Sequence, residues 1–173
     1  MQFFNERAAH YAVADFYAGI AASTFDVNIR SELHECMAKD EGLESLWDQA
    51  LSHLSQGREE KWKAGFREAR ERSAQDLAEC GKYSDDLNMI GYQLVNWWET
   101  FWGQGEEVAL DIIQKNRTAN KGTLFKQVVS MRFNWETGYP FDAGKRLGNF
   151  WMILIGEPVW SNAGHHEHHE HQQ

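Results

Sequence analysis

The chain has 173 residues, of which 42% are hydrophobic and 13% are aromatic, and its formal net charge at pH 7 is −9. This length suits one domain with a sizeable core, and the apolar content excludes an intrinsically disordered chain. The negative balance argues against nucleic acid as a partner, because phosphate binding needs a basic surface.

The cysteines and the apolar runs bear on the compartment. Cys36 and Cys80 show no C-x-x-C spacing, and we do not expect them to form a disulfide framework. The first residues lack a basic segment followed by an apolar run, so no signal peptide is predicted. The longest apolar run, around residues 151–155, is far too short for a membrane span. We therefore expect a cytoplasmic protein with reduced cysteines and no membrane association.

Four helices are predicted in the first half of the chain. The first runs from a cap at Asn5 to about residue 22, the second covers about residues 26–39, and the third extends from a cap at Asp40 to a stop at Gly57. The fourth, residues 58–80, has a narrow apolar stripe among charged side chains. That pattern predicts a peripheral helix, or one that pairs with a partner helix.

The most distinctive stretch is residues 87–102. Its apolar side chains, three tryptophans among them, fill an arc of roughly 160° around a helix without a polar interruption. Ser84 is expected to cap this helix, with Asp85 and Asp86 at the positive end of its dipole. We interpret it as the central, buried helix of a bundle.

The last third is less regular. A short helix is predicted at residues 106–115, a turn at 137–140, and a final helix from a cap at Asp142 to about Leu154, despite Gly144 and Gly148. Residues 123–133 fit a helix or a strand; we choose a helix, because a lone strand has nothing to pair with. The prediction is an all-α fold: one bundle of six to eight helices (residues 1–160) and a His-rich polar tail (residues 161–173).

The tail is the sharpest compositional feature. Several neutral imidazoles in a short segment can bind Ni, Zn or Cu. The alternative is a plain low-complexity end or an affinity sequence used for purification. The predicted metal ligands are His165, His166, His168, His169 and His171.

No catalytic signature is present, and we predict no catalytic residue. The sequence contains no H-E-x-x-H, no phosphate loop, no dinucleotide fingerprint and no G-x-S-x-G. His10, His34 and His53 fall on three predicted helices, but any three histidines can be grouped in this way.

Candidate binding residues come from two patterns. Tyr92 and Asn96 belong to the polar arc of the Trp-rich helix, which lines a cleft or is simply solvated. Trp135, Tyr139 and Trp160 belong to the aromatic excess of the last third, which is presented to a partner or folds back over the bundle.

Function follows from these patterns as an expectation. We predict a small acidic interaction protein, such as an inhibitor, an immunity-type factor or an adaptor, that binds a protein partner. The alternatives are metal binding or buffering through the tail, and an enzyme with an unrecognised helical site.

Overall fold

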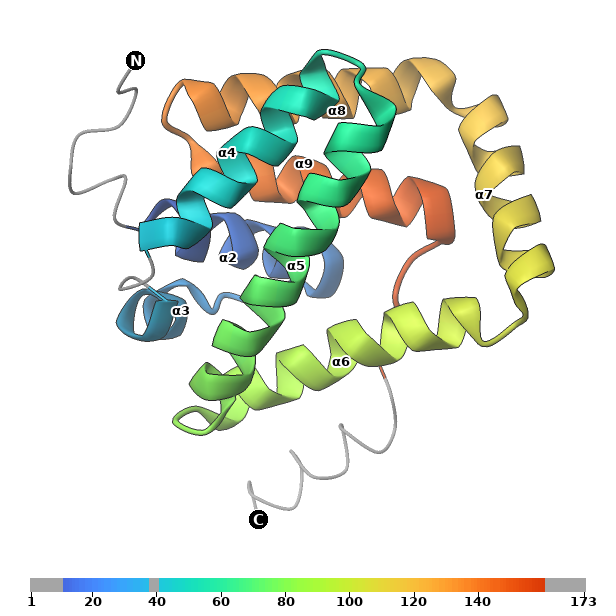
Figure 1. Ribbon diagram of the computed structural model, residues 1–173. Helices are drawn as coiled ribbons and strands as arrows, with labels where there is room; N and C mark the ends of the chain where they lie inside the picture. Colours follow the sequence, from blue (N-terminus) through green and yellow to red (C-terminus); the bar gives the residue numbers. More distant parts are fainter. Residues whose placement is uncertain (1–10, 38–40, 161–173) are drawn as a thin grey trace.

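The computed structural model describes residues 11–37 and 41–160, and within these ranges every regular element is an α-helix. The predicted all-α bundle is confirmed there (Figure 1). The predicted caps at Asn5 and Asp40 and the tail lie outside the described residues. The helices are α2 (Ala12–Phe25), α3 (Arg30–Met37), α4 (Glu41–Ser55), α5 (Glu59–Gly81), α6 (Asp85–Trp102), α7 (Glu106–Ala119), α8 (Lys121–Glu136) and α9 (Pro140–Ile155).

Local signals set several helix ends as predicted. The Ser84 side chain accepts a hydrogen bond from the Leu87 N–H at the start of α6 (3.3 Å). Gly57, with φ +66°, follows α4 in a left-handed conformation that favours glycine. The predicted cap of the last helix at Asp142 is wrong: α9 begins at Pro140, whose missing N–H costs nothing in a first turn, and Asp142 lies within that turn. The ambiguous residues 123–133 are helical and lie within α8, so the choice of helix is confirmed.

The centre of the molecule is the α2–α9 pair, which touches through glycines. A Cβ atom on Gly144 would overlap the main-chain carbonyl of Phe16, and one on Gly19 would overlap that of Phe141. Without side chains at these positions the two backbones approach closely. Gly144 and Gly148, which lower the helix propensity of this segment, therefore form the surface through which α9 contacts α2.

The predicted central position of the Trp-rich helix is wrong, although the helix itself forms. Figure 1 shows α6 along one edge of the molecule, beneath α5. Trp97, Trp98 and Trp102 are half-buried. The physical reason for the wide apolar face is that α6 borders two clusters: Leu87 belongs to the larger core, Phe101 to a smaller one around α7 and the end of α9. The width of an apolar arc indicates how much of the helix surface is in contact with other elements. It does not indicate where in the molecule the helix lies.

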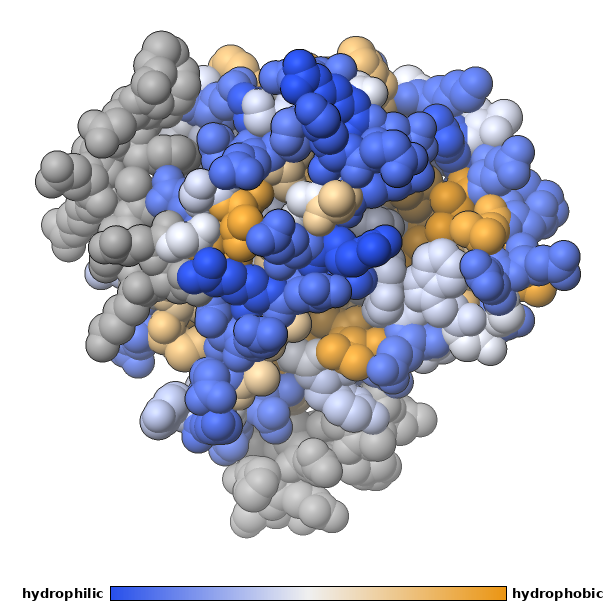
Figure 2. All heavy atoms as spheres, in the orientation of Figure 1, coloured by the Kyte–Doolittle hydropathy of each residue, from blue (hydrophilic) through white to orange (hydrophobic). Residues whose placement is uncertain are grey.

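The peripheral position predicted for residues 58–80 is confirmed. Few side chains of α5 are buried, chiefly Ala69, Ser73 and Cys80. Figure 2 shows that the face over α4 and α5 is mainly hydrophilic, with hydrophobic atoms gathered in smaller areas beside α6 and α7.

The expectation of unpaired, reduced cysteines is corrected. Cys36 of α3 and Cys80 of α5 form a disulfide, with their Cα atoms 5.5 Å apart and a sequence separation of 44. The spacing of two isolated cysteines does not predict such a pair, because the two residues become neighbours only when folding packs α3 against α5. Among the described helices, none has both the length and the apolar character needed to cross a bilayer.

Candidate binding pocket

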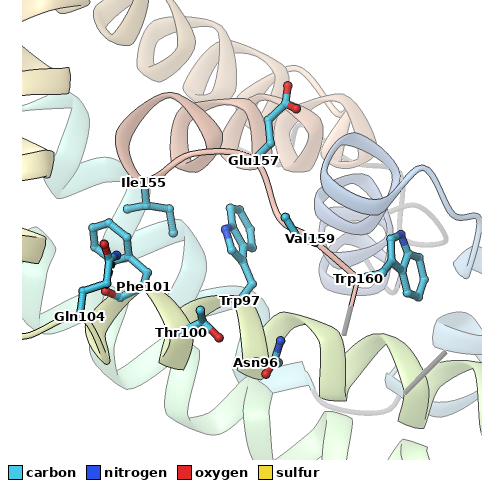
Figure 3. A pocket seen from close by; sticks show the side chains of 9 residues that line it. All are labelled: Asn96, Trp97, Thr100, Phe101, Gln104, Ile155, Glu157, Val159 and Trp160. Carbon is cyan, nitrogen blue, oxygen red and sulfur yellow. Dashed lines mark hydrogen bonds between the residues drawn. The ribbon is translucent and has the colours of Figure 1, made fainter. Parts of the chain in front are cut away.

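A pocket of about 350 Å³ lies between the C-terminal half of α6 and the segment that follows α9 (Figure 3). Its size falls at the lower end of the range for ligand sites. The residues that line it are Asn96, Trp97, Thr100, Phe101, Gln104, Ile155, Glu157, Val159 and Trp160.

The α6 wall follows from helical spacing. Asn96 and Thr100 are one turn apart, as are Trp97 and Phe101, so both pairs line the same side of the helix. Figure 3 shows the Trp97 ring between α6 and the opposite segment, with Phe101 and Ile155 to one side and Val159 to the other. The Trp97 ring also meets Phe25 of α2 edge-on, at 6.1 Å between centroids. That contact fixes the ring at the base of the pocket.

The opposite wall depends on one glycine. Gly156 ends α9 with φ +91°, a conformation that side chains rarely adopt. The chain then turns back past α6, and Trp160 packs edge-on against Phe25 at 5.4 Å between centroids. Residues 157–160 are thereby held across from α6, which forms the pocket.

The chemistry of the lining suits binding rather than bond making. The walls are apolar, while Asn96, Thr100 and Gln104 supply polar groups along the α6 side. The Gln104 amide donates to the Phe101 carbonyl (2.9 Å). Of the residues that line the pocket, Glu157 alone carries a formal charge. An apolar side chain enters such a site, and polar groups around it fix the orientation.

The structure separates the five predicted binding residues. Asn96 and Trp160, which are far apart in sequence, line the pocket together. Tyr92 is exposed one turn before Asn96 on α6, and Tyr139 is exposed in the turn between α8 and α9. Trp135 is only 1% exposed, and its indole N–H donates to Asp48 (3.2 Å). Trp135 is therefore a core residue, because its position on α8 faces α4 and α2 and not a loop surface.

No sequence pattern indicated that Thr100, Gln104, Glu157 and Val159 line a site. Thr100 is an ordinary polar position of α6, Gln104 lies in the turn after it, and Glu157 and Val159 follow the end of α9. They become neighbours only because Gly156 reverses the chain direction. Long-range placement of this kind leaves no periodic pattern in a single sequence.

A second polar cluster, which sequence reasoning missed, joins α2 to α3. Asp15 is buried and accepts two hydrogen bonds from Arg30, from Nε (2.7 Å) and Nη2 (3.1 Å). His34 Nε2 contacts the same carboxylate, and the Tyr11 ring stacks on the His34 imidazole at 4.4 Å. The hydrogen bond to Asp15 raises the pKa of Arg30, so the guanidinium stays charged. These contacts of Asp15 with Arg30 and His34, which we call the α2–α3 clamp, hold α3 against α2.

Metal ligation is not seen in the part of the chain that the structure describes. There, no group of three or more His, Cys, Asp or Glu side chains is placed to hold an ion. His34 is engaged by Asp15, His53 lies on α4, and His10 falls outside the described residues. The five predicted tail ligands, His165, His166, His168, His169 and His171, fall outside them too.

Comparison with known proteins finds no matching family model, no matching curated protein and no matching solved structure. These comparisons therefore indicate no activity for this chain, and its function has to be inferred from its own residues.

Proposed function

We propose that this chain is an interaction protein that binds a protein partner through the pocket between α6 and residues 157–160. The observation that supports the proposal is the pocket itself: apolar walls at Trp97, Phe101 and Ile155, with polar groups beside them. Binding sites for anchoring side chains in protein interfaces have this anatomy. An aromatic or large aliphatic side chain of the partner is the natural occupant of a pocket of about 350 Å³.

Charge supports a basic partner segment. The chain carries a formal net charge of −9, and Glu157 lines the pocket. Glu106 and Glu107 open α7 after Gly105, two and three residues beyond Gln104, so further carboxylates follow one end of the site along the chain. A lysine or arginine beside the anchoring side chain is attracted by this field, which speeds encounter and disfavours acidic partners.

The test is affinity capture from the native host with three forms of the full chain. Thr100→Arg places a large cation at the mouth of the pocket, and the exposed position of Thr100 leaves the core intact. Val95→Arg is the matched control, because Val95 is also exposed on the same helix but does not line the pocket. We expect one partner in roughly equimolar yield with the unchanged chain and with Val95→Arg, and its loss with Thr100→Arg.

Two results contradict the proposal. One is equal capture by all three forms, which places the binding surface elsewhere. The other is the absence of any stoichiometric partner from the unchanged chain. Circular dichroism of Thr100→Arg provides the control for folding, since the substitution should leave helix content unchanged.

The metal-binding alternative stays a prediction of the sequence, carried by the five histidines of residues 165–171. Metal content of protein purified without a nickel column, with and without these residues, tests it. The cytoplasmic location also stays a prediction. The Cys36–Cys80 disulfide weighs against it, because such bonds persist mainly in oxidising compartments.

A further inference from the structure

Helix α8 is apolar on two opposite faces. Its inward face carries the buried side chains of Leu124, Met131 and Trp135. A surface helix of a globular protein normally has polar residues on the opposite side. Here the outward face presents a second apolar stripe, defined by Phe125, Val129 and Phe133, which are 69%, 50% and 63% exposed.

This outer stripe is regular. Its three members are spaced by four residues, so each lies one turn beyond the last, displaced by about 40° around the helix. Figure 1 shows α8 along an outer edge of the molecule, on the far side from α6. Three large apolar side chains held in water in one row are a feature of interaction surfaces rather than of an inert face.

We propose that the occupant of the outer stripe is a second copy of this chain, bound by an antiparallel pairing of the two α8 helices about a two-fold axis at Val129. The stripe is symmetric about this residue, since Phe125 lies four positions before it and Phe133 four positions after it. In the pairing, Phe125 of each copy is level with Phe133 of the other, on opposite sides of the seam. The rings therefore interdigitate, and the two Val129 side chains meet on the axis, as an isologous contact requires.

Two of the charged residues that flank the stripe match this orientation. Lys121 is eight residues before Val129 and Glu136 seven residues after it, and both lie toward the same edge of the stripe. Antiparallel pairing places Lys121 of each copy within about 1.5 Å, along the axis, of the level of Glu136 in the other. Two intermolecular ion pairs result by symmetry, beside the bond that Glu136 already accepts from Arg132 of its own helix. A parallel pairing would instead place like charges together.

A glycine also lies on the contact line. Gly122 is close to the centre of the stripe, seven residues before Val129, and no atom lies within 4 Å of the position that its Cβ would occupy. The missing side chain leaves room for the second helix at one end of the seam. The α8 pairing uses none of the residues that line the α6 pocket, so it is independent of the proposed function.

Sedimentation velocity of the full chain tests the pairing, with EDTA present so that metal bound to the histidines does not join copies. We expect a dimer that dissociates on dilution from about 200 µM to about 1 µM, the range of a small interface. Val129→Glu brings two carboxylates together on the axis and should raise the dimer Kd about 100-fold. The matched control is Val95→Glu, an equally exposed valine on α6 that should leave the Kd unchanged.

Charge exchange tests the orientation. Lys121→Glu and Glu136→Lys alone should each weaken the dimer about 10-fold, whereas the double variant restores it because each pair is re-formed with its signs reversed. In oxidising buffer, Val129→Cys should give a covalent dimer, and Val95→Cys should not. A chain that stays monomeric at about 200 µM overturns the proposal. A dimer that Val129→Glu leaves intact, or that the double variant does not restore, does so as well.

Discussion

Gly144 of α9 lies directly against the main-chain carbonyl of Phe16 in α2, with no room for a side chain between them. The contact joins two helices that are distant in sequence. Gly19 makes the reciprocal contact with the carbonyl of Phe141, so the pair is closed from both sides. The architecture of the bundle depends on this approach, because the remaining helices pack around the α2–α9 pair.

A single added methyl group tests the importance of that contact. Gly144→Ala forces the Phe16 carbonyl to move, and we expect the free energy of unfolding to fall by about 1–3 kcal/mol, as for other overpacked sites. Urea titration followed by circular dichroism measures it. The matched control is Gly91→Ala in α6, where a Cβ meets no atom within 4 Å. That change should raise stability by about 0.5–1 kcal/mol through helix propensity. Equal effects of the two substitutions would contradict the close α2–α9 packing.

The Cys36–Cys80 disulfide closes a long loop, so its reduction should cost stability. A bond that spans 44 residues is expected to contribute about 2–4 kcal/mol, mainly by restricting the unfolded chain. The measurement is the urea midpoint with and without a reductant. A Cys36→Ala, Cys80→Ala double variant should match the reduced protein and ignore the reductant. Two reactive thiols in the untreated, folded protein would show that the bond is not formed.

The buried carboxylate of Asp15 should matter more than an exposed one. Asp15→Asn removes the acceptor charge that Arg30 binds through two nitrogens, and half of the Arg30 side chain remains in solvent. We therefore expect a loss of about 1–3 kcal/mol, below the cost of breaking a fully buried pair. Glu59→Gln breaks the exposed pair with Lys63 and should leave the unfolding curve unchanged. The account of the α2–α3 clamp fails if the two variants unfold at the same urea concentration.

Alkaline pH should destabilise the fold through Tyr17. Burial of its hydroxyl near Ser73 and Trp47 raises the pKa of Tyr17 above the ordinary value of 10.0. The folded state then holds its proton where the unfolded state releases it, so stability falls as the pH rises above about 10, by up to about 1.4 kcal/mol per pH unit. Tyr17 as a whole residue is only partly buried, which makes this slope an upper value. Tyr17→Phe should remove the part of this loss of stability that comes from Tyr17. Identical curves of unfolding free energy against pH for both proteins would contradict the burial of the Tyr17 hydroxyl.

Local features of this fold were predictable and tertiary ones were not. The Ser84 cap, the Gly57 stop and the helical character of residues 123–133 depend on neighbours in sequence, and all three are confirmed. The predicted cap at Asp142 was wrong, since α9 already begins at Pro140. The position of α6 was mispredicted, because an apolar arc does not say which other helix covers it. The Cys36–Cys80 bond depends on the packing of α3 against α5, which no spacing encodes.

The candidate site shows the same division. Asn96 was identified from its place on the polar arc of α6, and Trp160 from its place among surplus aromatics. Nothing in the sequence indicated that they share one pocket, since that follows from the reversal at Gly156. Trp135 belonged to the same aromatic group but faces the core, because the helical register of α8 and not its composition decides its direction.

Site-specific photo-cross-linking in the native host tests the pocket most directly. A photoreactive phenylalanine analogue replaces Thr100 at the pocket mouth in one protein and Tyr83, which is 86% exposed in the turn before α6, in another. We predict one cross-linked partner from position 100, joined through a segment with an aromatic or large aliphatic side chain beside a basic residue, and none from position 83. Cross-linking of the same partner from position 83 alone, or of no partner from position 100, would contradict the assignment of the pocket.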